Sequence, residues 1–374
     1  MKRVIAKDGA DENLADPGFS SELIAWQKKH GRHSLPWQQT RDAYRVWLSE
    51  IMLQQTQVSA VIPYYRRFLE RFPDVASLAA APAEDVMALW SGLGYYSRAR
   101  NLHQCAKDVM HRHGGKFPAD PGLLAELPGI GRSTAAAIAA FSYGARAAIL
   151  DGNVKRVFAR VFAIDGFPGD KAVENMLWRR AEALLPLKNL EAYTQGLMDL
   201  GATVCTRSKP ACGSCPFEKR CLALRDDRVD ALPVRKARKA TPEKSKVMLV
   251  VIDGGQVLLE QRPDYGIWGG LLSLPEIDVP QDGLPAQAFI DQFERAIAPY
   301  GAPSGHEELA PLSHGFTHFK LHISPYRVSL ARRTVMVAEQ AAVWYDGDKL
   351  AAAPLPAPVK KLLLAVFAGD AGRL

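Results

Sequence analysis

The segment Leu127-Pro-Gly-Ile-Gly-Arg-Ser-Thr134 joins two stretches of helical periodicity through a Gly-x-Gly turn. Such a turn points successive backbone N–H groups outward at the start of the second helix, where they lack intrahelical partners. They lie at the positive end of the helix dipole, and Gly129 and Gly131 permit a close approach, so the turn is a candidate phosphate site. The alternative is an ordinary helical hairpin, and the rest of the sequence is needed to choose between them.

Helical periodicity continues on both sides of this hairpin. Between residues 20 and about 225, apolar residues recur at helical spacing between Gly and Pro breaks, and no strand-like alternation interrupts them. The expected N-caps are Ser20 or Ser21, Asp42 and Asp151. Further helices are expected from Pro82 to near Gly92 and over Ser97–His113, Leu123–Leu127, 132–144, 171–184 and 191–204. We therefore predict a tail of residues 1–19 and an all-α domain of residues 20–225.

The hydrophobic period changes after a basic stretch. Residues 226–246 are rich in Lys and Arg and poor in apolar residues, which is typical of a linker. Beyond it, two apolar runs flank a Gly-Gly turn, a later segment alternates, and a helical pattern ends the chain. These elements are Val247–Ile252, Gly254-Gly255, Val257–Leu259, His318–Leu330 and Pro358–Phe367. They predict a separate α+β domain over residues 247–374.

Composition limits the class of protein. The 374 residues are enough for two to three domains, and 48% hydrophobic content excludes a wholly disordered chain. Forty-seven Lys and Arg against 40 Asp and Glu give a net charge of +7, which favours a polyanionic partner without naming it. No window approaches the ~18 consecutive apolar residues of a membrane span. Because Met1–Phe19 also lacks the apolar segment of a signal peptide, we expect a cytoplasmic protein with no membrane partner.

Four of the five cysteines lie close together, in the pattern Cys205-x6-Cys212-x2-Cys215-x5-Cys221. Thiols stay reduced in the cytosol, so this spacing indicates a metal site and not a disulfide framework. Thiolate ligation serves both zinc and iron–sulfur clusters. Zinc sites commonly pair two short Cys-x-x-Cys units and only one is short here, so the spacing favours an iron–sulfur cubane while leaving zinc open. Cys105 stands apart and is interpreted as a packed apolar side chain.

Two carboxylates occupy unusual positions. Glu50 lies on an otherwise apolar helix, and Asp151 follows an apolar pair at the start of another. An exposed helix face for Glu50 and a helix cap for Asp151 are the simple interpretations. As a pair they match cleavage of a glycosidic bond, in which one carboxylic acid protonates the leaving group and one carboxylate stabilises the cationic sugar.

These features lie within longer motifs. They are Leu48-Ser-Glu-Ile-Met-Leu-Gln-Gln-Thr-Gln-Val58, Gly92-Leu-Gly-Tyr-Tyr-Ser-Arg98, Leu127–Thr134, Leu150-Asp-Gly-Asn-Val-Lys-Arg-Val157, Met198-Asp-Leu-Gly201 and the cysteine spacing. Together they resemble the MutY family of adenine DNA glycosylases, which belongs to the helix-hairpin-helix glycosylases with endonuclease III. The resemblance runs in order from residue 20 to about 370. It implies a helix-hairpin-helix catalytic domain over residues 20–225, whose last part, about 151–225, holds a [4Fe-4S] cluster on the four cysteines.

The resemblance also implies an activity and its catalytic residues. It implies a monofunctional glycosylase that removes adenine opposite 8-oxoguanine or guanine from double-stranded DNA in base excision repair. We expect a monomer, whose protein partners the sequence does not identify. Glu50 matches the family's general acid, and Asp151 matches the carboxylate facing the developing cation, with Asn153 beside it. Ser133 stands where related bifunctional enzymes have a lysine that forms a Schiff base, which a hydroxyl cannot form, so no strong lyase activity is expected.

Further positions match family residues that contact DNA. Gln55 and Tyr95 match residues that enter the gap left by the flipped adenine and hold the opposite base. Gln38 and Gln195 match adenine-pocket positions that are Arg and Glu in some relatives. The predicted set of DNA- and base-contacting residues is Gln38, Gln54, Gln55, Tyr95, Gly129, Gly131, Arg132, Gln195, Phe316, Thr317 and His318.

The last three of these lie in residues 247–374, which resemble a Nudix domain. The glutamate-rich metal box of Nudix hydrolases is missing after Trp268-Gly-Gly270, so no pyrophosphate hydrolysis is expected. Phe316-Thr317-His318 matches the family's Phe-Ser-His loop, which contacts 8-oxoguanine, and Thr317 keeps the hydroxyl while adding a methyl group. The resemblance therefore implies an 8-oxoguanine recognition domain.

Three other functions compete with adenine removal. An endonuclease III-like enzyme for oxidised pyrimidines is opposed by Ser133 and by the additional domain. A DNA-binding protein without activity would use the hairpin and the cysteines for docking alone. A nucleotide hydrolase would need the missing metal box.

Overall fold

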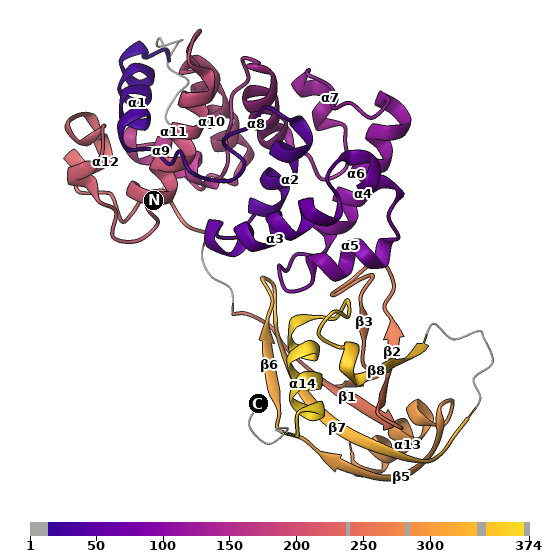
Figure 1. The fold of residues 1–374 in the computed structure, drawn as a ribbon. Coiled ribbons are helices and arrows are strands. Elements are labelled where there is room, and N and C mark those ends of the chain that lie inside the picture. Colours follow the sequence, from indigo (N-terminus) through magenta and orange to yellow (C-terminus); the bar gives the residue numbers. More distant parts are fainter. Residues whose placement is uncertain (1–13, 237–239, 281–284, 335–341, 370–374) are drawn as a thin grey trace. The chain divides into compact units, whose positions relative to one another are not determined.

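The structure is a computed structural model that describes residues 14–236, 240–280, 285–334 and 342–369 (Figure 1). The chain forms two compact units. The first unit comprises Met1–Tyr65, Phe72–Ala79 and Gln104–Ala237, and the second comprises Arg66–Arg71, Ala80–His103 and Arg238–Leu374. Residues 1–13 of the predicted tail and 237–239 of the predicted linker lie outside the described residues.

The chain from residue 17 to residue 225 is helical, as predicted. Its α-helices are α1 (Pro17–His30), α2 (Ala43–Leu53), α3 (Val58–Arg71), α4 (Val75–Ala80), α5 (Ala83–Trp90), α6 (Ser97–His113), α7 (Pro121–Ala125), α8 (Arg132–Tyr143), α9 (Gly152–Val161), α10 (Lys171–Ala183), α11 (Leu190–Asp199) and α12 (Leu222–Arg225). The π-helix Leu200–Val204 continues α11. None of the described helices is both long enough and apolar enough to cross a membrane.

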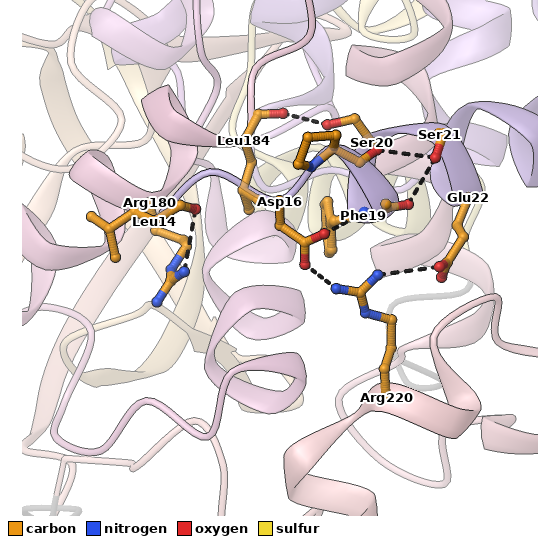
Figure 2. A network of polar contacts seen from close by, with 11 residues as sticks. Leu14, Asp16, Phe19, Ser20, Ser21, Glu22, Arg180, Leu184 and Arg220 are labelled. Carbon is orange, nitrogen blue, oxygen red and sulfur yellow. Dashed lines mark hydrogen bonds and ion pairs between the residues drawn. The ribbon is translucent and has the colours of Figure 1, made fainter. Parts of the chain in front are cut away.

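Two of the predicted helix caps are confirmed and one is wrong. Asp42 accepts a hydrogen bond from the Tyr44 N–H at 2.9 Å, and Asp151 caps α9. α1 begins at Pro17 and not after Ser20 or Ser21, because the Asp16 carboxylate caps it by accepting from the Phe19 N–H at 3.0 Å. Proline suits this first turn, which needs no N–H donor. The Ser20 hydroxyl instead donates to the Leu184 carbonyl, which ties α1 to the end of α10 (Figure 2).

The core of the first unit joins α1, α9, α10 and α11 to the cysteine-rich loop. Phe19, Phe158, Leu177 and Phe217 are fully buried in it. Rings of this size each remove roughly 150–250 Å² from water when buried, so they dominate the stability of this region. The helices that carry Asp151 and Gln195 are therefore held by a rigid core.

The second unit contains a mixed sheet. Its strands are β1 (Glu243–Asp253), β2 (Gln256–Gln261), β3 (Leu272–Ser273), β4 (Glu276–Val279), β5 (Gly301–Glu308), β6 (Leu312–Gly315), β7 (Lys320–Arg333) and β8 (Ala342–Asp346). The order is β3-β2-β1-β7-β5, with β4 paired to β1, β6 to β7 and β8 to β2. β1 and β7 are parallel and the other pairs are antiparallel. α13 (Ala286–Ile297) and α14 (Ala357–Phe367) accompany the sheet in the residues after 240, which thus have an α+β fold (Figure 1).

The predicted strands and last helix of this unit are present, with changed ends. β1 begins at Glu243 and not at Val247, so the last residues of the basic stretch belong to the sheet. At the other end of that stretch, the carbonyls of Val229 and Leu232 accept hydrogen bonds from Arg160 Nε, at 3.0 and 2.9 Å. The free part of the predicted linker is therefore shorter than residues 226–246.

Candidate active site and cysteine site

A cavity of about 500 Å3 opens in the first unit among α2, α11 and the loop before α2. Its walls include Glu50 from α2, Gln38 from the loop and Gln195 from α11. Trp37 and Phe141 add aromatic surface. The volume lies within the range of about 300–1,000 Å3 that is usual for small-molecule sites. Three predicted site residues from separate segments therefore meet around one space.

Glu50 is one of two glutamates that line this cavity, together with Glu191. α2 buries Val46, Leu48 and Ile51, and it presents Glu50 at the cavity wall. Removal from bulk water penalises the charged carboxylate, and the negative charge of Asp151 adds to this penalty, so the pKa of Glu50 rises to about 8. Glu50 is therefore mostly protonated at neutral pH and can donate its proton to a group in the cavity.

Asp151 is held in place as the N-cap of α9. Its Oδ1 accepts a hydrogen bond from the Val154 N–H at 2.8 Å. Burial raises the pKa of Asp151, while hydrogen bonds from the backbone of Val154 and Asn153 and the charge of Arg156 act against this rise. These donors and the helix dipole stabilise the anionic form of Asp151 and so oppose the effect of burial.

Ser133 controls the backbone that leads into Asp151. Its hydroxyl oxygen accepts a hydrogen bond from the Leu150 N–H at 2.9 Å, so α8 fixes the residue directly before the acid. The hydroxyl therefore orders the backbone directly before Asp151. A hydroxyl also supplies no amine that could attack a sugar carbon.

Arg156, which sequence reasoning missed, connects Asn153 to the cysteine-rich loop. Its Nη2 donates to Asn153 Oδ1 at 2.8 Å and to the Gly201 carbonyl at 2.7 Å, and its Nε donates to the Cys205 carbonyl at 2.7 Å. A Cβ on Gly201 would lie 2.5 Å from Asn153 Cβ, so only glycine fits there. The available signal was helical spacing, because Arg156 follows Asn153 by three residues and therefore shares its face of α9.

The predicted phosphate hairpin has the expected backbone. Gly129 has a φ of 79°, and Gly131 is the N-cap of α8 without a side-chain cap bond. A Cβ at Gly131 would meet no atom within 4 Å, which leaves room for an anion at the helix start. Gln54 Nε2 donates to the Gly129 carbonyl at 3.4 Å and so lies against the turn.

Arg132 has protein partners of its own beside this hairpin. Its Cζ lies 3.8 Å from the centroid of the Trp178 ring, and its guanidinium pairs with Glu182. Guanidinium groups favour such stacking over an aromatic face. Arg132 thus ties the start of α8 to α10, and a phosphate contact would have to share its guanidinium with Glu182.

Gln55 and Tyr95 share an uncommon backbone conformation. Their φ values are 58° and 49°, in the left-handed region that side chains other than glycine rarely adopt. Such strain persists where surrounding structure enforces it, often at functional sites. Tyr95 is 46% exposed whereas the adjacent Tyr96 is buried, so Tyr95 is the tyrosine available to a partner. The two residues belong to different units, Gln55 to the first and Tyr95 to the second.

The segment of Phe316, Thr317 and His318 lies in the second unit. The Phe316 ring stacks on Phe319 with centroids 4.5 Å apart, which fixes the base of the segment. Thr317 and His318 are exposed. Thr317 Oγ1 lies 3.4 Å from the hydroxyl of Tyr95, also in this unit. The structure therefore brings two predicted recognition residues together.

The four predicted ligand cysteines line one small cavity in the first unit. Apolar side chains from α9, the π-helix and α12 form the rest of its wall, among them Val157, Leu200 and Leu224. Arg160 of α9 holds the loop, because its Nη1 donates to the Thr206 carbonyl at 2.7 Å and lies 3.5 Å from Cys205 Sγ. The four cysteines thus line a common space and are partly exposed.

The loop between Cys215 and Cys221 docks on α1. The Phe217 ring stacks on Phe19 with centroids 4.2 Å apart and an interplanar angle of 11°. Arg220 pairs with Asp16 and Glu22 at the start of α1 (Figure 2). The first helix of the fold therefore supports the cysteine site.

Two segments of the chain match known families. Residues 48–183 match the HhH-GPD superfamily base excision DNA repair protein family, and residues 247–365 match the NUDIX domain family. The chain is 36% identical over 346 residues to the adenine DNA glycosylase of Buchnera aphidicola subsp. Schizaphis graminum, covering 92% of this chain and 97% of that one. It is 33% identical over 401 residues to the adenine DNA glycosylase of Homo sapiens, covering 92% and 73%. A solved thermostable thymine-DNA glycosylase aligns with a TM-score of 0.51 at 29% identity, covering 56% of this chain and 96% of that one.

Proposed function

The chain belongs to the adenine DNA glycosylases, base excision repair enzymes that hydrolyse the N-glycosidic bond of adenine, and on this premise we propose that it removes adenine opposite 8-oxoguanine with Glu50 and Asp151 as its catalytic acids. The observation that carries the proposal is the state of Glu50. It lines a cavity of suitable size, and burial raises its pKa to about 8. A proton donor at neutral pH is the group this reaction needs.

The residues of the first unit suffice for the reaction. A stacked base is out of reach, so the adenine must leave the duplex and enter the cavity beside Glu50. Glu50 protonates a ring nitrogen, and the C–N bond breaks with its electron pair going to the base. Asp151 stabilises the oxocarbenium-like sugar, and the ionised Glu50 accepts a proton from the water that adds to it. Ser133 cannot form a Schiff base, so no strong lyase activity is expected to accompany base removal.

Base release from defined duplexes tests the proposal. Duplexes with one adenine opposite 8-oxoguanine, opposite guanine or opposite thymine are compared under single-turnover conditions. We expect adenine release from the first two, faster opposite 8-oxoguanine, and none from the third. Absence of adenine release opposite 8-oxoguanine would overturn the proposal, and a covalent adduct trapped by borohydride would support the lyase alternative.

Ser133→Ala is expected to slow adenine release about tenfold and to lower the free energy of unfolding by about 1 kcal/mol, because the Leu150 N–H loses its acceptor beside Asp151. Single-turnover rates and urea denaturation measure the two effects. Ser133→Thr keeps the hydroxyl and should recover most of both. Unchanged values in Ser133→Ala would show that this hydrogen bond does not position Asp151.

We further propose that Thr317 and His318 contact the 8-oxoguanine, since both are exposed and Thr317 lies beside the exposed Tyr95. A threonine hydroxyl can both donate and accept, which suits the polar edge of an oxidised purine. The contact would distinguish 8-oxoguanine from guanine without touching the adenine.

Thr317→Val is expected to reduce the ratio of excision rates opposite 8-oxoguanine and opposite guanine by roughly fivefold to tenfold, since a net hydrogen bond contributes about 1 kcal/mol. Valine keeps the shape of threonine and removes only the hydroxyl. Thr317→Ser restores the hydroxyl and should preserve the ratio. The same ratio in all three proteins would exclude the hydroxyl from recognition.

We propose that Cys205, Cys212, Cys215 and Cys221 hold a [4Fe-4S] cluster. No group of three or more His, Cys, Asp and Glu side chains among the described residues is placed to hold a metal ion, yet the four thiols line one cavity. Thiols spaced around a cavity suit a group larger than a single ion. Thiolate bonds to such a cluster would cross-link a loop that has little regular structure.

We also propose that the hairpin binds a DNA phosphate through the first N–H groups of α8. The open space beside Gly131 permits a close approach, the positive φ of Gly129 forms the turn, and Gln54 supports it. Phosphate contacts of this kind position a protein on the duplex without reading its sequence.

A further inference from the structure

Two of the glutamines that line the cavity, Gln38 and Gln195, differ in how their amides are hydrogen-bonded. Gln38 Oε1 accepts from the Leu35 N–H at 3.0 Å, and its Nε2 donates to the Arg32 carbonyl at 2.8 Å, so the loop engages both ends of that amide. Gln195 Nε2 donates to Asp199 Oδ1 at 2.8 Å. In the part of the chain that the structure describes, no residue donates a hydrogen bond to Gln195 Oε1.

Asp199 determines which way the Gln195 amide points. It is the last residue of α11 and is fully buried. Its carboxylate also accepts from the Arg32 N–H at 2.9 Å and from Arg32 Nε at 2.7 Å. A carboxylate paired with a guanidinium is ionised and can only accept hydrogen bonds. Turning the Gln195 amide round would place its carbonyl against this anion, so the amide nitrogen must face Asp199.

With the nitrogen committed to Asp199, the carbonyl is the free end of Gln195, and Gln195 lines the cavity. We propose that Asp199 is a positioning residue that presents Gln195 Oε1 to the cavity as a fixed acceptor and so selects a purine with an amino group at C6. The inference rests on the proposed function, because it takes the cavity to hold the flipped base. The 6-amino group of adenine donates to this oxygen, whereas the 6-oxo group of hypoxanthine sets a second acceptor against it.

This arrangement explains how a neutral glutamine can provide specificity at the position. A free amide could rotate to offer either its donor or its acceptor, and it would then tolerate both 6-amino and 6-oxo purines. The ion pair between buried Asp199 and partly buried Arg32 removes that freedom. A site built around a fixed hydrogen-bonding group rejects an unmatched substrate more strongly than a site that distinguishes by shape.

Relative rates on three bases test the inference. Duplexes carrying adenine, hypoxanthine or unsubstituted purine opposite 8-oxoguanine are assayed with the native protein and with Asp199→Asn, Gln195→Leu and the control Asp226→Asn. Asp226 is a surface carboxylate that does not line the cavity. Because each ratio compares two substrates of one preparation, partial unfolding lowers both rates and leaves the ratio unchanged.

In Asp199→Asn, the new side-chain amide can donate a hydrogen bond to Gln195 Oε1, so the Gln195 amide is free to turn round. We therefore expect the ratio of adenine to hypoxanthine excision in this variant to fall about tenfold or more. Gln195→Leu should lower the ratio of adenine to purine excision by a similar factor, and Asp226→Asn should change neither. An unchanged adenine-to-hypoxanthine ratio in a folded Asp199→Asn protein would overturn the inference. If Asp199→Asn does not fold, the Gln195→Leu variant decides the question. An adenine-to-purine ratio in that variant equal to the ratio in the native protein would then overturn the inference by itself. Failure of the native protein to release adenine would instead refute the proposed function.

Discussion

Glu50→Gln is expected to reduce adenine release by roughly 10²–10⁴-fold, the usual contribution of a general acid–base group, while binding of the mispaired duplex persists. Glutamine keeps the size of the side chain and its place on the cavity wall, but it has no carboxyl proton to give. Single-turnover rates and a gel-shift titration separate the two effects. Glu84→Gln, which changes an exposed glutamate of α5, is the matched control and should leave both unchanged.

The raised pKa of Glu50 makes this prediction specific in pH. The rate of adenine release should stay constant at pH values below the pKa of about 8 and fall above it, because Glu50 then loses its proton. The free energy of unfolding should also decrease with rising pH, because the pKa of Glu50 in the folded protein lies above the ordinary value of 4.5. Between pH 4.5 and about 8, Glu50 is ionised in the unfolded chain but still protonated in the folded protein, so each rise in pH favours the unfolded chain.

Glu50→Gln has no charge to bury and escapes this loss. We expect its melting temperature to exceed that of the native protein at pH 9 but not at pH 4. Melting curves that stay parallel from pH 4 to pH 9 would show that Glu50 titrates normally and is not held as an acid. Full adenine release by Glu50→Gln would remove it from the mechanism altogether.

Sequence signals predicted the elements whose determinants are local. Asp42 and Asp151 cap helices because the side chain and the N–H groups it accepts from are two or three residues apart. Gly144 ends α8 with a φ of 68°, a conformation that glycine adopts readily. β5 lacks such a signal, since its residues from 302 to 308 are all exposed and show no alternation. Its pairing with β7, a partner distant in sequence, orders it.

The same difference between local and long-range determinants is seen in the candidate site. Glu50 and the four cysteines stood out because their residue types are unusual in their local context. Asp199 lay within a motif that carried the family resemblance, yet nothing local indicated its role. That role depends on Arg32, which is 167 residues away and reaches Asp199 only in the fold. Sequence thus identified groups that do chemistry, whereas the structure was needed to find a group that orients them.

Cys215→Ser is expected to remove the iron–sulfur chromophore and to destabilise the first unit by on the order of 4 kcal/mol or more, the scale of losing a structural metal site. The loop from Cys205 to Cys221 contains only short 3-10 turns, so its own backbone hydrogen bonds cannot hold it. Its other supports are the stacking of Phe217 on Phe19, the pairing of Arg220 and the hydrogen bond from Arg160 to the Thr206 carbonyl. Visible absorbance, iron content and urea denaturation measure the loss.

Cys105→Ala provides the matched control, because Cys105 is buried in α6 and does not line the cysteine cavity. It should keep its iron and lose only about 1 kcal/mol of packing. Adenine release by Cys215→Ser should fall further than its binding of undamaged duplex, because the loop connects to Asn153 through Arg156 as well as to α1. Undiminished iron in Cys215→Ser, or stoichiometric zinc in the native protein, would show that the thiols do not hold a four-cysteine iron–sulfur cluster.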